Sequence, residues 1–164
     1  MKPTLIVLLL SGVFAGEKEP PAEPKPGKHA ADEKALLDLL NEARKKEKLP
    51  PLKANAVLKK VALLHSENMA KKEKMAHQLD GKGVGDRTET GGYDYRVVRE
   101  NLAAAEGEAD SPAPKPQEIH DMWMASKGHR ANLLDERVTE VGIAIAVSKK
   151  GTYFYTQVFA TPRK

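Results

Sequence analysis

The chain has 164 residues, of which 40% are apolar, and 27 Lys and Arg against 23 Asp and Glu give it a net charge of +4. It contains no cysteine, which excludes a disulfide-stapled fold and thiol catalysis. Its length suits one domain with its own core. Charges of both signs are mixed, as in Lys71-Lys72-Glu73-Lys74, and no basic stripe interleaves with aromatic residues, so nucleic-acid binding is not expected.

The N-terminus has the pattern of an export signal. Lys2 supplies a positive start, residues 5–10 form an apolar stretch too short to span a bilayer, and Val13-Phe14-Ala15 resembles a cleavage site. We predict a signal peptide over residues 1–15, and a mature chain without a transmembrane segment. This predicts a secreted protein, extracellular or held at the cell envelope. An N-terminal anchor that is never cleaved is the alternative.

A linker and two helices are predicted next. Residues 16–30 contain four prolines, several charges and few apolar side chains, so we expect an extended linker before a folded domain over 31–164. An apolar stripe over 36–43 predicts a helix that ends before Pro50-Pro51. A second helix is predicted over 54–72. Its apolar stripe includes His65, which favours a hydrogen-bonded core histidine over a ligand.

The middle of the chain has weaker periodicity. Residues 78–96 are rich in Gly, Asp, Arg and Thr, which predicts an irregular loop. The glycine run at 81–85 does not match a phosphate-binding loop, because no apolar strand precedes it and no Gly-Lys-Ser/Thr follows. A proline-rich patch at 111–116 precedes a predicted helix over 117–126. A short helical turn is expected over 130–134.

Strands are predicted mostly at the end of the chain. The apolar period falls to two over 141–147 and 153–159, and residues 148–151 suit a hairpin turn between them. Residues 99–104 are predicted to form a third strand. Helices that come first and strands that come mostly last predict an α+β fold with a small antiparallel sheet.

The residues that could support chemistry are scattered. The motifs Gly-x-Ser-x-Gly and His-Glu-x-x-His are both absent. His77, Glu100 and His129 lie near predicted element ends, where each by itself suits a surface or structural role. Ser126 lies three residues before His129, which on a continuous helix could bring the two together, although Gly128 makes that continuity doubtful.

Five segments taken together resemble one family. In chain order they are Met-Ala-His at 75–77, Arg-Glu-Asn-Leu-Ala at 99–103, Met-Trp-Met-Ala-Ser-Lys-Gly-His-Arg-Ala-Asn-Leu-Leu at 122–134, Glu-Val-Gly-Ile-Ala at 140–144 and Tyr-Thr-Gln-Val-Phe at 155–159. Their order is typical of the CAP superfamily of cysteine-rich secretory, antigen 5 and pathogenesis-related 1 proteins. The chain resembles its bacterial, disulfide-free SCP-like branch over residues 31–162. The resemblance implies a three-layer α-β-α sandwich with a central antiparallel sheet.

The resemblance also implies a surface cleft with two His and two acidic residues, which can bind Zn²⁺ or another divalent cation. By motif position, the first His is His77 and one acid is Glu100. The chain departs from the pattern at Ser126, where the family has an acid, and at Phe154, where it has a His. By the same resemblance, His129 could supply the second imidazole.

Two interpretations of that cleft stay open. His77, Glu100 and His129 could form a three-ligand metal site completed by water. Alternatively, Glu100 accepts N–H groups from both imidazoles without a metal, which we favour. Apart from such a metal, no cofactor is expected.

Neighbouring motif residues suggest structural roles. Asn101, Arg130 and Asn132 are expected to fix loop backbones through side-chain hydrogen bonds. Trp123, at helical spacing among apolar residues, is expected to lie in the core.

Three functions remain open. The chain could be a binding module that recognises an envelope or cell-wall component, a lipid or a small ligand in the cleft lined by His and Glu, which predicts an apolar-walled groove without turnover. It could hydrolyse peptides or esters, with His77 or His129 as base, Glu100 orienting it, and Ser126 or a metal-bound water as nucleophile. It could be a structural wall-associated domain. In each case we expect a monomer.

Overall fold

A computed structural model describes residues 27–107 and 114–163. The predicted signal peptide over 1–15 and most of the predicted linker lie outside the described residues. The elements are α1 (Ala30–Lys46), β1 (Lys53–Ala54), α2 (Ala56–Lys72), α3 (Val84–Thr90), β2 (Tyr95–Glu106), α4 (Pro116–Ala125), α5 (Lys127–Leu133), β3 (Glu140–Val147) and β4 (Thr152–Pro162). Within the described ranges, no helix is both long and apolar enough to cross a membrane.

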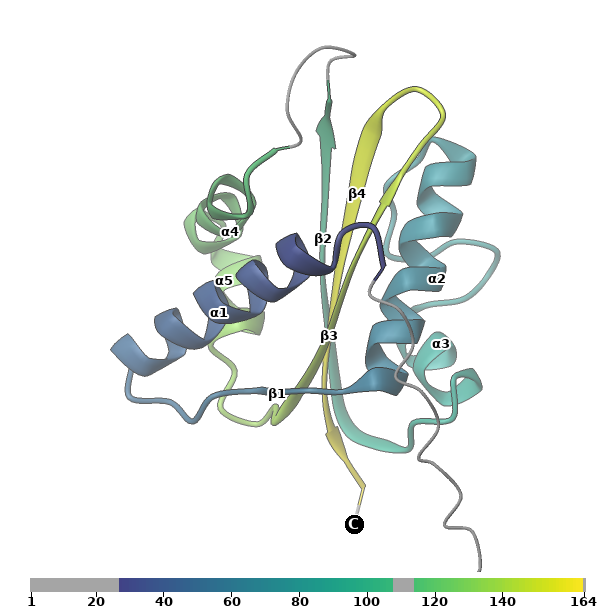
Figure 1. Cartoon of the computed structure of the whole chain (residues 1–164). Coiled ribbons are helices and arrows are strands. Elements are labelled where there is room, and N and C mark those ends of the chain that lie inside the picture. The colour runs from purple at the N-terminus through teal and green to yellow at the C-terminus, as the bar shows by residue number, and fades with distance from the viewer. Residues whose placement is uncertain (1–26, 108–113, 164) are drawn as a thin grey trace, which may run out of the picture.

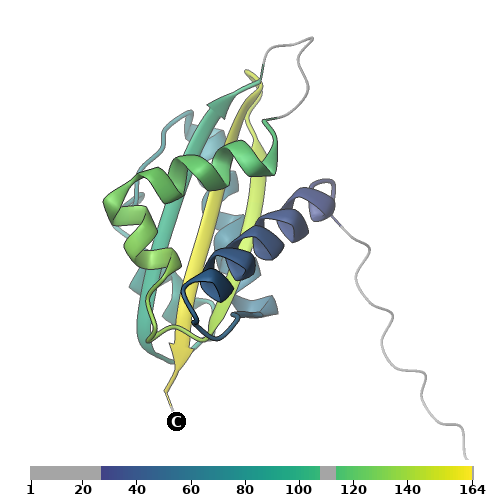
Figure 2. The same ribbon diagram turned by 90° about the vertical axis from the view of Figure 1, so that its left-hand side faces the viewer.

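A four-stranded sheet lies between two layers of helices. Its strand order is β1-β3-β4-β2, and the three long strands pair antiparallel. Helices α2 and α3 cover one face, and α1, α4 and α5 cover the other (Figures 1 and 2). The predicted α+β sandwich is therefore confirmed. The sheet is mixed, because the two-residue β1, which sequence analysis missed, pairs parallel with β3 at Glu140 and Val141.

The alternation of β3 separates two parts of the core. Ile143 and Ile145 pack in the larger cluster beneath α1, α4 and α5, whereas Ala144 packs beneath α2. Trp123 of α4 is fully buried in the larger cluster, as predicted, and its Nε1 donates to the Leu102 carbonyl of β2 at 2.9 Å. This bond connects α4 to β2, which is an edge strand of the sheet.

The structure differs from the sequence prediction in the middle of the chain. The predicted loop over 78–96 contains α3 and the first residues of β2. A seven-residue helix is too short to show a helical period, and the glycines at both of its ends and at Gly85 favour a loop prediction instead. Strand β2 extends beyond the predicted 99–104 at both ends, and α5 begins at Lys127 rather than at residue 130.

Helix α2 approaches the sheet very closely at Gly142 of β3. A Cβ at this position would lie 2.1 Å from the backbone C of Leu58 and 2.1 Å from the backbone N of Lys59, both in α2. Only glycine lets the helix backbone lie this close to the strand. This contact therefore sets the height of α2 above the sheet.

We predict that Gly142→Ala lowers the free energy of unfolding by about 3 kcal/mol, because the added methyl group must displace backbone atoms rather than a flexible side chain. Urea denaturation measures the change. Gly128→Ala in α5 is the matched control, since no atom lies within 4 Å of its added Cβ. This control should gain about 0.5–1 kcal/mol from helix propensity. Equal effects of the two substitutions would contradict the steric argument.

Candidate functional site

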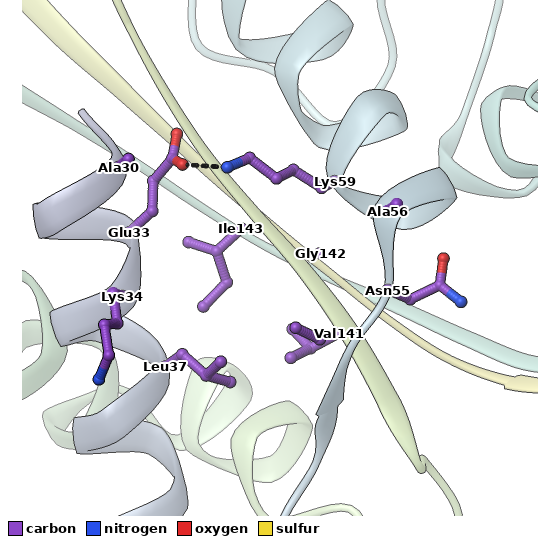
Figure 3. A pocket seen from close by; sticks show the side chains of 11 residues that line it. Ala30, Glu33, Lys34, Leu37, Asn55, Ala56, Lys59, Val141, Gly142 and Ile143 are labelled. Carbon is purple, nitrogen blue, oxygen red and sulfur yellow. Dashed lines mark ion pairs between the residues drawn. The ribbon is translucent and has the colours of Figure 1, made fainter. Parts of the chain in front are cut away.

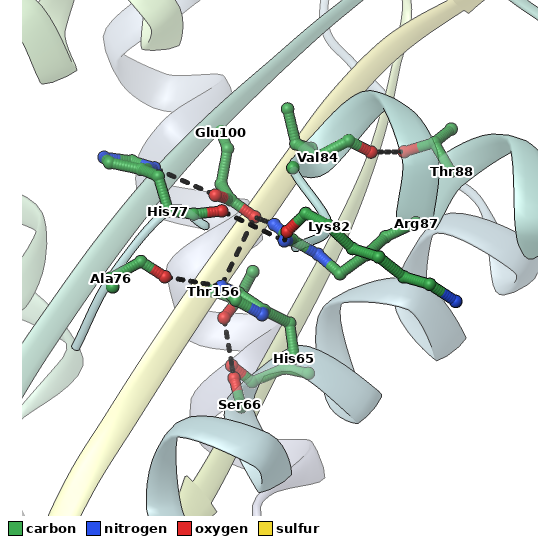
Figure 4. A network of polar contacts seen from close by, with 12 residues as sticks. His65, Ser66, Ala76, His77, Lys82, Val84, Arg87, Thr88, Glu100 and Thr156 are labelled. Atoms are coloured by element: carbon green, nitrogen blue, oxygen red, sulfur yellow. Dashed lines mark hydrogen bonds and ion pairs between the residues drawn. The ribbon is translucent and has the colours of Figure 1, made fainter. Parts of the chain in front are cut away.

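A buried carboxylate on β2 is the centre of the candidate site. The Glu100 side chain is 1% exposed, and both of its oxygens have partners. Oε1 accepts from Nδ1 of His77 at 2.9 Å, and Oε2 accepts from Nη2 of Arg87 at 2.5 Å (Figure 4). Because a carboxylate only accepts hydrogen bonds, Nδ1 of His77 is the donor, which leaves Nε2 of this 63% exposed side chain available.

Arg87 connects Glu100 to the segment that follows α2. Its Nη1 donates to the carbonyl oxygens of His77 at 3.0 Å and Lys82 at 2.9 Å. Helix α3 presents this guanidinium, and its first turn is capped by a 2.8 Å bond from the Gly83 N–H to Oδ2 of Asp86. Sequence analysis missed Arg87, because no pattern distinguishes it from other charged residues of a glycine-rich segment.

His65 of α2 lies beside this cluster as a core histidine, as predicted. It is 1% exposed, and its Nε2 donates to the Ala76 carbonyl at 3.0 Å. The same nitrogen lies 4.0 Å from Oε2 of Glu100. Burial, and secondarily the positive charge of Arg87, lower the pKa of His65 to about 4. The imidazole is therefore neutral near pH 7.

His129 of α5 lies within electrostatic range of His77 but outside the hydrogen-bonded cluster. Burial first, and the charge of His77 second, lower the pKa of His129. Its Nδ1 is buried, and no partner for this atom exists among the described residues. Within the described residues, no hydrogen bond joins His129 to the carboxylate of Glu100. The structure thus brings His77 and Glu100 together and leaves His129 separate.

Two asparagines hold α5 against β2. Nδ2 of Asn132 donates to the Glu100 carbonyl at 3.1 Å and to Oδ1 of Asn101 at 2.9 Å. Nδ2 of Asn101 donates to the His129 carbonyl at 3.2 Å. Both asparagines bond backbone carbonyls, as predicted, but these carbonyls belong to β2 and α5 rather than to loops. Arg130 differs, because it forms a largely exposed ion pair with Glu47 at 2.8 Å.

The predicted metal set of His77, Glu100 and His129 does not fit a divalent ion in this arrangement. No three His, Asp or Glu side chains within 27–107 and 114–163 are placed to hold one. The guanidinium of Arg87 already occupies one oxygen of Glu100, and its positive charge disfavours a cation there. The metal site therefore stays a prediction that this arrangement does not support. Of the metal-free alternative, the structure shows the bond between His77 and Glu100.

The structure agrees with the doubt, raised from the sequence, that one helix continues from Ser126 to His129. Ser126 has φ −87° and ψ 122°, an extended conformation that separates α4 from α5. The two residues therefore do not lie on one continuous helix. Within the described residues, the Ser126 side chain has no hydrogen bond to an imidazole. The hydroxyl thus lacks the adjacent base that activates a serine nucleophile.

An apolar groove lies away from this cluster, between α1 and α2 (Figure 3). We call it the α1–α2 groove. Its volume is about 440 Å³, and Val141, Gly142 and Ile143 of β3 form its floor. Glu33 of α1 and Lys59 of α2 form an ion pair across it at 2.6 Å. His77, His129 and Glu100 line none of five cavities in the described part of the chain, of which the α1–α2 groove is one.

We predict that Arg87→Met lowers the free energy of unfolding by about 3–5 kcal/mol, because it leaves the buried carboxylate of Glu100 without its cation. Adding Glu100→Gln should restore part of this loss, since a neutral amide is less costly to bury. Urea denaturation of both variants measures the two changes. Asp38→Asn, which breaks the exposed pair with Lys34, should have no measurable effect. A loss no larger than that control would show that the Arg87 pair is unimportant.

We predict that His65 makes the fold less stable in mild acid. Its pKa is about 4 in the folded protein and near 6.5 when unfolded, so the unfolded chain binds more protons between these values. The free energy of unfolding should therefore fall by about 3 kcal/mol as the pH decreases from 6.5 to 4, and this contribution stays constant outside that window.

Urea denaturation across this pH range measures the effect. His65→Gln, whose amide can still donate to the Ala76 carbonyl, should remove it. His29→Gln near the start of α1 is the control and should retain the pH dependence of the original chain. An unchanged pH dependence in His65→Gln would assign the proton uptake to other groups.

Comparison with known proteins agrees with this fold. The family model named CAP, the Cysteine-rich secretory protein family, matches residues 37–159. In Bacillus subtilis (strain 168), the uncharacterized protein YkwD is 31% identical over 133 residues, covering 80% of this chain and 49% of YkwD. The uncharacterized membrane protein YlbC of the same strain is 34% identical over 128 residues, covering 77% of this chain and 34% of YlbC. The chain thus spans half or less of each of these relatives.

Solved structures show the same architecture. An outer surface protein from Borrelia burgdorferi has a TM-score of 0.74 at 21% identity, covering 84% of this chain and 97% of that one. An extracellular protein containing a SCP domain from Bacillus anthracis has a TM-score of 0.64 at 30% identity, covering 82% of this chain and 41% of that one. With the family model matching most of its folded residues, the chain belongs to the CAP family of cysteine-rich secretory proteins.

Proposed function

We propose that this CAP domain is an exported binding module that holds a small apolar ligand, or the chain of a lipid, in the α1–α2 groove without turnover. The observation that supports this most directly is the groove itself. Its lining combines apolar and small residues: Ala30, Leu37, Ala54, Ala56, Val141 and Ile143. A concave site of this size with a few polar groups is typical of small-molecule binding.

The floor of the groove offers backbone hydrogen bonds to a ligand. The Asn55 N–H donates to the Val141 carbonyl at 3.0 Å, where the chain leaves β1 for α2. Strand β1 pairs with β3 only as far as Val141, so in the described chain no strand covers this edge at Ile143. The backbone of Ile143 points to the same edge as that of Val141, because strand residues alternate. A polar group on the ligand could bond there.

The ion pair of Glu33 and Lys59 gives the groove a polar boundary. The Glu33 side chain is only 10% exposed, and the Lys59 ammonium reaches it from the facing helix (Figure 3). The pair joins α1 and α2 across the apolar surface. A ligand would therefore bury its apolar part over β3 and keep its polar end near this boundary.

The polar cluster lacks groups that hydrolysis requires. Both oxygens of Glu100 accept hydrogen bonds within the protein, and the side chain is 1% exposed, so this carboxylate is poorly placed to take a proton from a substrate. His77 is oriented by Glu100, but no serine or threonine hydroxyl hydrogen-bonds to it in the described part of the chain. The cluster has a base and an orienting group without a nucleophile.

Export is part of the proposal and rests on two observations. The N-terminal residues have the pattern of a signal peptide. A relative from Bacillus anthracis, 30% identical to this chain, is described as an extracellular protein. A ligand met outside the cell or in its envelope agrees with both.

We predict that the neutral apolar dye N-phenyl-1-naphthylamine binds the domain with one-to-one stoichiometry and increased fluorescence. Ala56→Trp should weaken binding at least tenfold, because the indole fills the groove from the start of α2. Ala131→Trp is the matched control, since Ala131 is exposed on α5 and lines no cavity described above. Fluorescence titration measures both, and NMR amide shifts should locate the dye at Val141 and Ile143.

Saturable binding that survives Ala56→Trp would place the dye elsewhere and refute the groove as the site. Absence of saturable binding would refute the proposal for neutral apolar ligands of this size.

A further inference from the structure

A second cavity, which we call the α2–α3 pocket, lies on the other side of α2. It has a volume of about 290 Å³ and is formed by one face of α2, by α3 and by the segment between them. Its lining includes Lys60, Leu64, Lys82, Arg87 and Thr90. It shares no residue with the α1–α2 groove.

The charge of this pocket is of one sign. Three of its lining residues are cations, and none is a carboxylate. Within the described residues, Lys60 and Lys82 form no ion pair, in contrast to Lys59 and Lys72, which pair with carboxylates at 2.6 and 2.8 Å. The positive charge of Lys60 and Lys82 is therefore uncompensated, which favours an anion in the space between them.

Arg87 is the most buried cation of the pocket, with a side chain that is 12% exposed. Its Nη atoms are occupied by Glu100 and by two carbonyl groups. Its Nε is buried and has no hydrogen-bond partner within 27–107 and 114–163. A buried donor without an acceptor is unfavourable, so negative charge brought near this guanidinium is stabilised.

The remaining lining is apolar. Leu64 is 56% exposed, which is the largest exposure among the large apolar side chains of the described residues. It lies one helical turn after Val61, which also lines the pocket. A ligand with an apolar part would cover this exposed surface while its charged group contacts the lysines.

We propose that the α2–α3 pocket binds a small anionic amphiphile, that is, a phosphate or carboxylate group on a short alkyl or aryl chain. The anionic group lies between Lys60 and Lys82, and the apolar chain lies on Leu64. This site is independent of the proposed ligand in the α1–α2 groove.

Binding at this pocket also reaches the candidate site through Arg87. The same guanidinium that lines the pocket holds the His77 carbonyl and the Glu100 carboxylate. An anion that draws Arg87 toward the pocket changes the environment of the His77 imidazole. The NMR signals of the His77 imidazole should therefore change when a ligand occupies the pocket, although His77 does not line it.

The test is an NMR titration with octyl phosphate below its micelle concentration. We expect shifts in the amides of Lys60, Leu64 and Lys82 and in the imidazole of His77. Inorganic phosphate should bind at least tenfold more weakly, because it lacks the apolar part. Octylammonium should not bind here, because its charge is repelled.

The double variant Lys60→Gln, Lys82→Gln should weaken octyl phosphate binding at least tenfold. The control, Lys48→Gln with Lys150→Gln, makes the same change in net charge at exposed lysines that line neither cavity. If both double variants weaken octyl phosphate binding equally, the loss comes from the overall charge of the protein, and the proposed site is overturned. Leu64→Ser should weaken octyl phosphate binding without changing that of inorganic phosphate.

Equal affinity for octyl phosphate and inorganic phosphate would overturn the amphiphile assignment. Shifts at Lys60 and Lys82 without any change at His77 would overturn the link through Arg87.

Discussion

The burial of the Glu100 carboxylate is the constraint on which the polar half of the structure depends. An ion removed from water loses several kcal/mol of hydration energy, and only direct partners in good geometry offset that loss. Arg87 and His77 supply those partners from two segments that do not belong to the sheet. The chain between α2 and β2 must therefore fold so that both side chains reach β2, and this requirement explains how a glycine-rich stretch of low apolar content becomes ordered.

The same interaction limits what the cluster can do, because the guanidinium and the imidazole already contact both oxygens of the carboxylate, and the positive charge of Arg87 disfavours a metal ion beside it. The apolar spaces that could hold a ligand lie instead on either side of α2. Lys59 faces the α1–α2 groove and Lys60 faces the α2–α3 pocket, although the two are adjacent in the chain. The close contact with Gly142 fixes this shared wall against β3, and farther along the helix His65 lies beside Glu100. A shift of α2 would therefore change both cavities and the polar cluster together.

Local sequence patterns were sufficient to predict most of the helices and strands and the family of this protein. Helical and strand periodicity predicted α1, α2, α4, β3 and β4 because each buries one face against a common core, and the ordered motifs indicated the CAP family. Core positions for Trp123 and His65 followed from the same periodicity. The positions of Asn101 and Asn132 in the family motifs also indicated that their side chains bond backbone groups. The acceptors, however, lie in elements distant in the sequence.

Only the tertiary structure decided the chemistry of the site. Arg87 reaches Glu100 across 13 residues of chain, and nothing in local periodicity marks such a long-range partner. Its presence makes a metal set at Glu100 unfavourable, which the motif resemblance could not reveal. The break at Ser126 separates two helices that spacing alone could have joined. The partners of buried charges and the shapes of cavities depend on which distant elements come into contact. Sequence periodicity indicates only which face of each element is buried.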